Sequence, residues 1–348
     1  MSNTLTSNHT PIIVAGPCSV ESPEQLREVT AQLVGRVNLI RGGVWKPRTR
    51  PGGFEGMGEQ ALRWMSDAKR DFPAARFCCE VARPEHVELC LRYGIDAVWI
   101  GSRTTGNPFS VGEICSALKG SRLPVMVKNP LTPDVKLWLG AIERVQQAGI
   151  DDVTAVHRGF FTYNNCGYRN TPLWEVPIEL KRLLPDMPVL CDPSHIGGRR
   201  DLLSQLMQTA IDLHFDGLMV EVHPNPGQAL TDAEQQSTPD AFFQMLENLR
   251  LHQDNDTPDA LRVLRQQIDD IDRQLLLLLG ERLDVSRRIA QVKADNNMAV
   301  FQPKRWEEVL AQKLQLAQEA GIDPGFVKEI YEKIHAESVK VQLGKGQA

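Results

Sequence analysis

Residues 124–128 read Pro-Val-Met-Val-Lys, a short apolar run that ends in a charged side chain. The run lacks polar alternation, as expected of a strand that is buried on both faces. Strands of this kind belong to parallel sheets whose two faces are covered by helices. Lys128 therefore stands at the end of a predicted buried strand, where a side chain is more often functional than merely solvated.

Seven further short runs resemble this one along the first 250 residues. They are Ile12–Ala15, Val37–Ile40, Arg76–Val81, Ala97–Ile100, Val153–Val156, Pro188–Leu190 and Gly217–Val220. Helical periodicity marks the segments between and after the runs: Pro23–Leu33, Gly58–Lys69, Pro84–Tyr93, Val111–Ala117, Pro133–Ala148, Trp174–Leu183, Arg199–Leu213 and Pro239–Leu249. Eight alternations of strand and helix predict an α/β fold closed into a (β/α)8 TIM barrel. The alternative is a doubly wound open sheet, which usually has fewer strands and one switch point for ligands.

The remainder of the chain has a different pattern. A polar stretch at 251–258 predicts a linker between a barrel domain at 1–250 and a helical domain at 259–348. From Pro258 to about Asn296 there is no further proline and one glycine, and apolar residues recur every three or four positions. This predicts one helix of roughly 55 Å, at about 1.5 Å per residue. Two shorter helices are expected at about 304–320 and 323–341, and the long apolar stripe needs a partner to cover it.

Composition narrows the possible partners. The 348 residues carry a formal net charge of −5, which gives no general attraction to nucleic acid. The longest apolar runs fall short of the ~20 residues that span a bilayer, so no membrane partner is expected. No secretory signal is visible in Met1–Thr10, and seven cysteines is an odd count. We therefore expect reduced thiols and a cytoplasmic protein.

Metal-binding side chains follow three of the predicted strands. Cys18 follows the first run, His195 the seventh, and Glu221 with Asp232 the eighth. Taken singly, each has an ordinary explanation, because a lone cysteine is usually a small buried hydrophobe. The C-terminal ends of barrel strands meet at one rim, however, where active sites lie. The joint set of sulfur, nitrogen and oxygen donors then suits manganese, iron or zinc.

Positively charged side chains follow the strands at the same rim. They are Arg41, Lys46, Arg48, Arg103, Lys128 and Arg158. A surface Lys or Arg is normally just solvated. Several cations on one rim repel one another unless anions fill the site, and arginine contacts phosphate or carboxylate in a bidentate manner. The pattern favours two phosphorylated small-molecule substrates.

Together these residues carry a family resemblance over roughly residues 10–250. The motifs are Gly16-Pro17-Cys18-Ser19, Lys46-Pro47-Arg48-Thr49, Ser102-Arg103-Thr104-Thr105, Lys128-Asn129, His157-Arg158-Gly159, Asp192-Pro193-Ser194-His195 and Glu221-Val222-His223-Pro224. The set resembles 3-deoxy-D-arabino-heptulosonate 7-phosphate (DAHP) synthase in its short beta subtype. The family condenses phosphoenolpyruvate with erythrose 4-phosphate and uses a divalent metal, for which manganese is favoured.

The resemblance implies a role for each residue. Cys18, His195, Glu221 and Asp232 would bind the metal; Arg41, Lys46, Arg103, Lys128 and Arg158 would bind phosphoenolpyruvate; and Lys46, Pro47, Arg48 and Thr49 would bind erythrose 4-phosphate. Lys46, Cys18 and His195 would be catalytic, with Lys46 protonating the new alkoxide. Arg50 stands where the family often has serine. A related synthase acting on arabinose 5-phosphate is the alternative, against which the Lys46–Thr49 motif argues.

The long predicted helix carries three cations at informative spacings. Arg282 and Lys293 are eleven residues apart and share a face, about 16 Å from each other along the axis. Arg265 lies roughly 25 Å before Arg282 and on a different face. If Arg265 and Arg282 serve one site, Arg265 must come from a second chain. The alternative is that all three are solvated helix charges.

A second resemblance covers about 257–345. The residues that carry it are Leu264-Arg265-Gln266-Gln267-Ile268-Asp269, Glu281-Arg282, Lys293, Arg305, Ser338 and Gln342. They resemble the all-helical chorismate mutases, which implies three helices per chain and an intertwined homodimer that converts chorismate to prephenate without a cofactor. Arg265, Arg282, Lys293, Arg305, Ser338 and Gln342 would bind chorismate or prephenate, and Lys293 with Gln342 would be catalytic at the ether oxygen. Trp306 stands where the family often places a glutamate that binds the substrate hydroxyl.

The two resemblances predict a bifunctional enzyme of the shikimate pathway. An alternative belongs to another class: the helical domain is mainly a dimerising, regulatory module that senses prephenate or chorismate. Mutase activity and its loss in Arg282→Ala separate the two.

Overall fold

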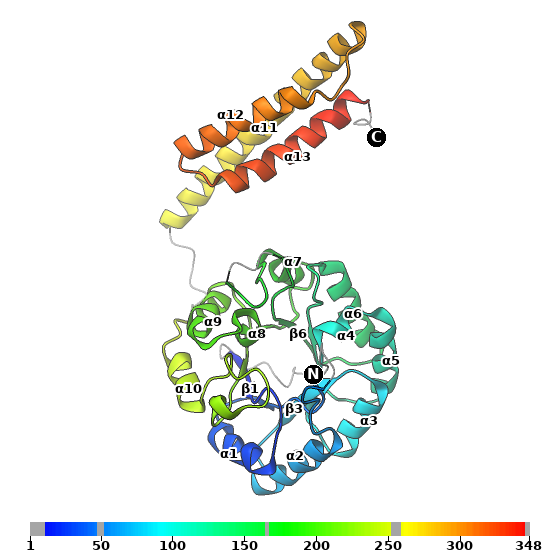
Figure 1. Cartoon of the computed structure of the whole chain (residues 1–348), viewed down its shortest axis with the longest axis vertical. Coiled ribbons are helices and arrows are strands. Elements are labelled where there is room, and N and C mark those ends of the chain that lie inside the picture. Colours follow the sequence, from blue (N-terminus) through cyan, green and yellow to red (C-terminus); the bar gives the residue numbers. More distant parts are fainter. Residues whose placement is uncertain (1–10, 47–51, 164–166, 252–258, 345–348) are drawn as a thin grey trace. The chain divides into compact units, whose positions relative to one another are not determined.

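Eight parallel strands close into a barrel in chain order, with β1 paired to β8 (Figure 1). The computed structural model describes residues 11–46, 52–163, 167–251 and 259–344. The strands are β1 (Ile12–Gly16), β2 (Leu39–Arg41), β3 (Phe77–Val81), β4 (Ala97–Ile100), β5 (Val125–Lys128), β6 (Val153–His157), β7 (Val189–Cys191) and β8 (Gly217–Glu221). The predicted TIM barrel is confirmed, and the open sheet is wrong.

Helices connect the strands and cover the outside of the barrel. They are α1 (Pro23–Leu33), α2 (Glu59–Asp71), α3 (Pro84–Arg92), α4 (Ser102–Thr105), α5 (Pro108–Leu118), α6 (Val135–Gln147), α7 (Glu175–Leu183), α8 (Pro193–Gly197), α9 (Leu203–Asp212) and α10 (Pro239–Glu247), with 3-10 turns η1 (Arg200–Leu202) and η2 (Pro226–Gln228). The short α4 and α8 were not anticipated from the sequence. They follow β4 and β7 directly and carry Arg103 and His195.

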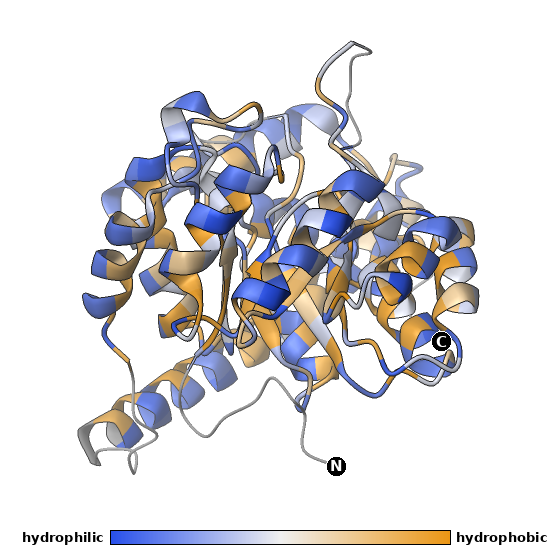
Figure 2. Ribbon diagram, turned by 90° about the horizontal axis from the view of Figure 1, so that it is seen from below, coloured by the Kyte–Doolittle hydropathy of each residue, from blue (hydrophilic) through white to orange (hydrophobic). Residues whose placement is uncertain are grey.

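The core lies inside the barrel and between the strands and the outer helices. Every residue of β1, β4, β5, β6 and β8 is buried, which explains why these strands lack polar alternation. Figure 2 shows the hydrophobic residues gathered on the strands and on the helix faces that turn toward them. Trp99 and Trp138 are the bulkiest of the fully buried side chains. The strand ends are thereby held in a rigid frame.

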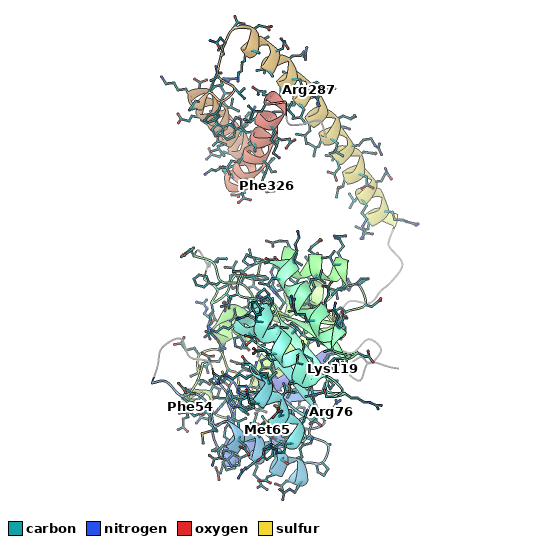
Figure 3. The ribbon with its side chains drawn as sticks, turned by 90° about the vertical axis from the view of Figure 1, so that its right-hand side faces the viewer. Phe54, Met65, Arg76, Lys119, Arg287 and Phe326 are labelled. Atoms are coloured by element: carbon teal, nitrogen blue, oxygen red, sulfur yellow. The ribbon has the colours of Figure 1, made fainter. Side chains whose placement is uncertain are left out.

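The remaining helices form a separate compact unit, divided from the barrel unit between residues 253 and 254. They are α11 (Asp259–Asp295), α12 (Pro303–Glu319) and α13 (Pro324–Gln342), so the single long helix is confirmed. The side chains of Leu264, Ile268, Ile271 and Leu278 on α11 are each more than half exposed. Figure 3, which labels Arg287 and Phe326, shows α11 extending past its two shorter neighbours. Among the described helices, none is long and apolar enough to cross a membrane.

Gly217 allows β8 to approach β1 closely. A Cβ atom at this position would lie 2.0 Å from the backbone oxygen of Ile12. We predict that Gly217→Ala lowers the free energy of unfolding by about 1–3 kcal/mol, because the two strands must move apart. Urea unfolding followed by circular dichroism measures this. Gly112→Ala on α5 is the matched control, since a Cβ there meets nothing within 4 Å. Equal stability of the two variants would contradict the prediction.

Candidate active sites

Three side chains that could bind a metal meet at the rim of the barrel, and we call them the metal-binding group. The ligand atoms of Cys18, Glu221 and Asp232 all lie within 4.8 Å of one another. Cys18 follows β1 and Glu221 ends β8, and these strands pair with Gly16 opposite Glu221. Cys18 Sγ lies 3.4 Å from Asp232 Oδ2. Strand pairing therefore brings together residues that are two hundred positions apart in the chain.

The loop that carries Asp232 holds the other two side chains in place. Gln236 Oε1 accepts a hydrogen bond from the Cys18 backbone nitrogen at 2.9 Å. Gln235 Nε2 donates to Glu221 Oε2 at 2.6 Å. Asp232 itself has a left-handed backbone conformation, with φ of 49°. The loop is thus bonded to the backbone of Cys18 and to the carboxylate of Glu221.

The electrostatics of this group fit a cation. The pKa of the Cys18 thiol is raised to about 12, mainly by burial and also by the negative charges of Glu221 and Asp232. The ammonium of Lys46 lowers this pKa, but by less. Burial also acts to raise the pKa of Asp232, but Arg169, His195 and Lys46 lower it to about 2. The two carboxylates disfavour a negative charge on the sulfur, and the neighbouring cations do not outweigh them. A divalent metal bound at these residues would supply the missing positive charge, because coordination deprotonates thiols.

His195 lies next to this group but is not part of it. Its Nε2 is 3.7 Å from Glu221 Oε1, and its Nδ1 is 2.8 Å from Asp192 Oδ2. Burial, together with Lys128, lowers the pKa of His195 in spite of Asp192, so its imidazole is neutral at neutral pH. A carboxylate on one ring nitrogen is the usual support of a metal-binding histidine, whose other nitrogen faces the ion. The arrangement fits a fourth ligand.

Asp192 lies within the candidate site, although the sequence analysis assigned it no role. It is fully buried, directly after β7, and caps α8 through the His195 backbone nitrogen. Its Oδ2 lies 2.6 Å from Lys128 Nζ and 4.0 Å from Arg41 Nη1. Burial acts to raise its pKa, but His195, Lys128 and Arg41 hold that pKa well below its usual range. Its position directly after the buried strand β7 is the feature of the sequence that could have indicated its importance.

Three of the predicted cations are buried at the same rim: Arg41, Lys128 and Arg158. Arg41 Nη2 donates to Glu221 Oε1 at 3.0 Å, while its Nε and Nη1 make no hydrogen bond. Burial lowers the pKa of Arg158 to about 10 despite the nearby Asp192. Arg103 is exposed on α4. A buried hydrogen-bond donor without a partner destabilises the folded protein, and a bound anion at this rim would satisfy the free donors of Arg41.

Lys46 connects the cations to the metal-binding group. Its Nζ donates to Cys18 Sγ at 3.0 Å. Burial acts to lower the pKa of Lys46, but Cys18 and Glu221 outweigh it and raise that pKa. The ammonium is therefore charged at neutral pH and has a proton to give. The predicted sugar-phosphate residues Pro47, Arg48 and Thr49 lie outside the described residues.

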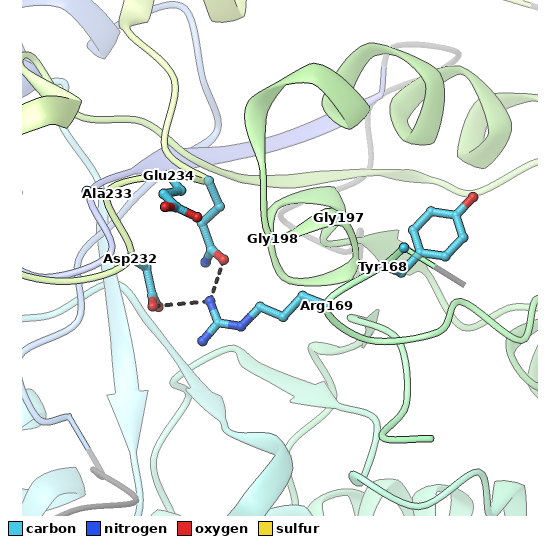
Figure 4. Close-up of a pocket in the computed structure, with 9 residues that line it drawn as sticks. Tyr168, Arg169, Gly197, Gly198, Asp232, Ala233 and Glu234 are labelled. Carbon is cyan, nitrogen blue, oxygen red and sulfur yellow. Dashed lines mark hydrogen bonds and ion pairs between the residues drawn. The ribbon is translucent and has the colours of Figure 1, made fainter. Parts of the chain in front are cut away.

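A cleft of about 500 Å³ opens beside Asp232 (Figure 4). It is lined by Gly167, Tyr168, Arg169, Gly197, Gly198 and residues 232–235. Arg169 Nη1 lies 3.1 Å from Asp232 Oδ1 and also contacts Gln235 Oε1. The sequence analysis missed Arg169, because it lies in the long loop between β6 and α7 rather than at a strand end. Of the metal-binding group, Asp232 is the member that lines this cleft.

Four of the predicted mutase residues converge in the helical unit. Arg282 Nη1 donates to Ser338 Oγ, which links α11 to α13. Lys293 Nζ donates to Gln342 Oε1 at 3.1 Å and also to the Val300 backbone oxygen. The two pairs join α11 to α13, and their members on α13 are four residues, about one helical turn, apart.

Two other predicted residues lie apart from these four. Arg305 is exposed and pairs with Glu308 at 3.2 Å. Arg265 is exposed, and the described part of the chain brings it to none of the four side chains. The ring of Trp306 stacks on His335, with centroids 4.0 Å apart and planes 17° apart. His335 is a further residue that the sequence analysis did not select.

Comparison with known proteins agrees with the two sites. The DAHP synthetase I family matches residues 3–254, and chorismate mutase type II matches residues 264–343. Phospho-2-dehydro-3-deoxyheptonate aldolase of Thermotoga maritima is 32% identical over 240 residues, which is 68% of each protein. A crystal structure of that DAHP synthase matches with a TM-score of 0.61 and 31% identity, covering 69% of this chain and 68% of the other. T-protein of Enterobacter agglomerans is 30% identical over 86 residues, 25% of this chain and 23% of T-protein.

The chain belongs to the DAHP synthetase I family and carries a C-terminal type II chorismate mutase domain. It is a bifunctional enzyme of the shikimate pathway, with a DAHP synthase domain and a chorismate mutase domain. Both predicted resemblances are confirmed. The alternative, in which the helical domain is mainly regulatory, is not better supported.

We predict that Asp192→Asn destabilises the protein by about 3–5 kcal/mol, because Lys128 then remains buried without its counter-charge. The midpoint of guanidinium unfolding measures the effect. Glu179→Gln is the control, since it breaks an exposed pair with Arg182 and should leave the midpoint unchanged. An Asp192→Asn midpoint equal to that of the wild type would show that Asp192 is not the required counter-charge.

Proposed function

We propose that the rim of the barrel condenses phosphoenolpyruvate with erythrose 4-phosphate at the residues described above. The observation that carries the proposal is the pair of buried cations Arg41 and Lys128 beside the group of Cys18, Glu221 and Asp232. The protein provides two fully buried carboxylates, Asp192 and Glu221, for this cluster of charges. An anionic substrate would neutralise the remaining positive charge. Phosphoenolpyruvate has two such anionic groups, a carboxylate and a phosphate.

Arg41, Lys46, Arg103, Lys128 and Arg158 hold phosphoenolpyruvate in this proposal. Arg41 Nε and Nη1 make no hydrogen bond within the described residues, so each can donate to an anionic group of the substrate. The indole ring of Trp99 makes cation–π contacts with two of these cations. Arg41 Cζ lies 5.0 Å and Lys128 Nζ 5.6 Å from the ring centroid. A fixed carboxylate and phosphate leave the methylene carbon oriented toward the second substrate.

The aldehyde of erythrose 4-phosphate then lies between the methylene carbon and Lys46. Attack of the enol carbon on the aldehyde carbon places negative charge on the aldehyde oxygen, and Lys46 Nζ delivers a proton there. Water adds at the cationic carbon of the former enol, and phosphate leaves. Pro47, Arg48 and Thr49 bind the sugar phosphate together with Lys46.

A divalent metal held by Cys18, His195, Glu221 and Asp232 would polarise the aldehyde oxygen as a Lewis acid. The mixed sulfur, nitrogen and oxygen donors suit manganese, iron or zinc. Manganese(II) is our preferred ion among these because of the family resemblance. The chelator EDTA should therefore abolish synthase activity, and added manganese should restore it.

We predict that Cys18→Ala weakens manganese binding by at least about 100-fold, because even the outer partners of metal ligands contribute 10–100-fold. Metal content after dialysis measures this independently of activity. Cys115→Ala is the matched control, since Cys115 is a buried thiol on α5, a helix of the outer layer. A Cys18→Ala protein that retains one tightly bound ion and full synthase activity would disprove this metal site.

The helical unit rearranges chorismate to prephenate in our proposal. Arg282 binds one carboxylate, and Lys293 with Gln342 faces the ether oxygen whose bond breaks. Preorganised donors of this kind are worth ~3–4 kcal/mol each in other enzymes. Ser338 fixes Arg282, and Arg305 assists binding from the start of α12. No covalent intermediate is required.

A second chain completes this site. Arg265 lies roughly 25 Å from Arg282 along α11, so it cannot reach the same small molecule within one chain. The exposed apolar residues of α11 need a partner, and a second copy of the same stripe provides one. An intertwined homodimer satisfies both requirements.

In the described part of the chain six cysteines are free, which fits a location in the reducing cytoplasm.

Subunit mixing tests the shared site. Arg265→Ala and Arg282→Ala should each lose most mutase activity, whereas an unfolded and refolded equal mixture should recover about a quarter of the wild-type activity. Half of the dimers are then mixed, and each mixed dimer has one intact site of two. Arg287→Ala is the control for Arg282→Ala, because Arg287 is exposed on the same helix. No recovery on mixing would mean that both arginines come from one chain or that they act separately.

A further inference from the structure

His335 lies near the charged residues of the proposed mutase site, although no role has been assigned to it. It stands on α13 three residues before Ser338 and seven before Gln342, so the three side chains share one face. Arg282 and Lys293 of α11 are the charges that act on its pKa. All three helices therefore contribute to its surroundings, with Trp306 stacked on it from α12.

The imidazole of His335 is held by aromatic rings on two segments. Trp306 lies nearly parallel to it at 4.0 Å, and Phe301 is tilted against it at 5.8 Å between centroids. Stacking of this kind restricts the rotation of the ring. The Nε2 atom is buried and makes no hydrogen bond within the described residues. A buried polar nitrogen without a partner is destabilising, and such groups are commonly retained for a ligand.

The charge state of His335 narrows the kind of ligand group. Burial, and after it Arg282 and Lys293, lower its pKa, so the ring is neutral at neutral pH. A neutral imidazole has one donor and one acceptor. It is poorly suited to a carboxylate, which pairs better with arginine, and well suited to a hydroxyl group.

Chorismate presents two carboxylates, an ether oxygen and one ring hydroxyl. In the proposed function the arginines bind the carboxylates, and Lys293 with Gln342 faces the ether oxygen. The hydroxyl is the group that remains without a partner. We propose that His335 binds the ring hydroxyl of chorismate through Nε2, and that Trp306 and Phe301 position its ring for this contact. This inference rests on the proposed mutase site.

A cycle of two changes tests the contact directly in the full-length protein. One change is His335→Leu, which keeps the size of the side chain and removes its hydrogen-bonding atoms. The other is a chorismate analogue that lacks the ring hydroxyl. We expect each change alone to lower kcat/KM by about tenfold, the value of one neutral hydrogen bond. Together they should lower it little further, because both remove the same contact.

Matched variants separate this contact from a general effect on folding. His335→Gln, which keeps a donor and an acceptor, should recover part of the activity with chorismate. Tyr331→Phe, one turn earlier on α13, should behave as the wild type, because Tyr331 faces Lys313. The synthase activity of each variant reports that the rest of the chain is intact. Full activity of His335→Leu, or losses that simply multiply in the cycle, would overturn the proposal.

The result also distinguishes this inference from the proposed mutase site. If Arg282→Ala loses activity while His335→Leu does not, the mutase site stands and the role of His335 is wrong. If Arg282→Ala is fully active, the mutase site itself is wrong, and with it the assignment of the hydroxyl contact.

Discussion

The barrel site depends on one buried carboxylate, that of Asp192. Three positive or proton-bearing groups from three strands converge on it: Lys128 from β5, Arg41 from β2 and His195 from the turn after β7. Cations cannot be buried together without negative charge between them, since removing one partner of a buried pair leaves an uncompensated charge. Asp192 and Glu221 provide that charge from the protein, and they leave donors of Arg41 without partners. These ion pairs therefore stabilise the buried cations and still leave donors of Arg41 available to an anionic substrate.

The sequence predicted the barrel because strands buried on both faces have a simple pattern, and because the end of such a strand marks the active rim. Cys18, Lys128 and Glu221 could be selected for that reason. Asp192 and Arg169 could not be assigned roles so easily. The importance of Asp192 depends on barrel closure, which brings the end of β7 within reach of Arg41 from β2 and Lys128 from β5. Arg169 reaches Asp232 from a loop that has no periodic pattern.

Helix geometry made the second site partly predictable. A rise of about 1.5 Å per residue is enough to group Arg282 with Lys293 and to separate Arg265 from both. It says nothing about which residues of α12 and α13 face them, because that depends on how three helices pack. The stack of Trp306 on His335 is the result of that packing. The two sites thus differ in kind: the synthase site is closed within one barrel, whereas the proposed mutase site needs residues from two chains.

The burial of Cys18 has a consequence for the chemical reactivity of its sulfur. Peroxides and other electrophiles attack the thiolate form of cysteine and react slowly with the neutral thiol. A pKa of about 12 keeps this sulfur protonated whenever no ion compensates the neighbouring carboxylates. A side chain that is 1% exposed and neutral is doubly protected from such reagents, by its burial and by its proton.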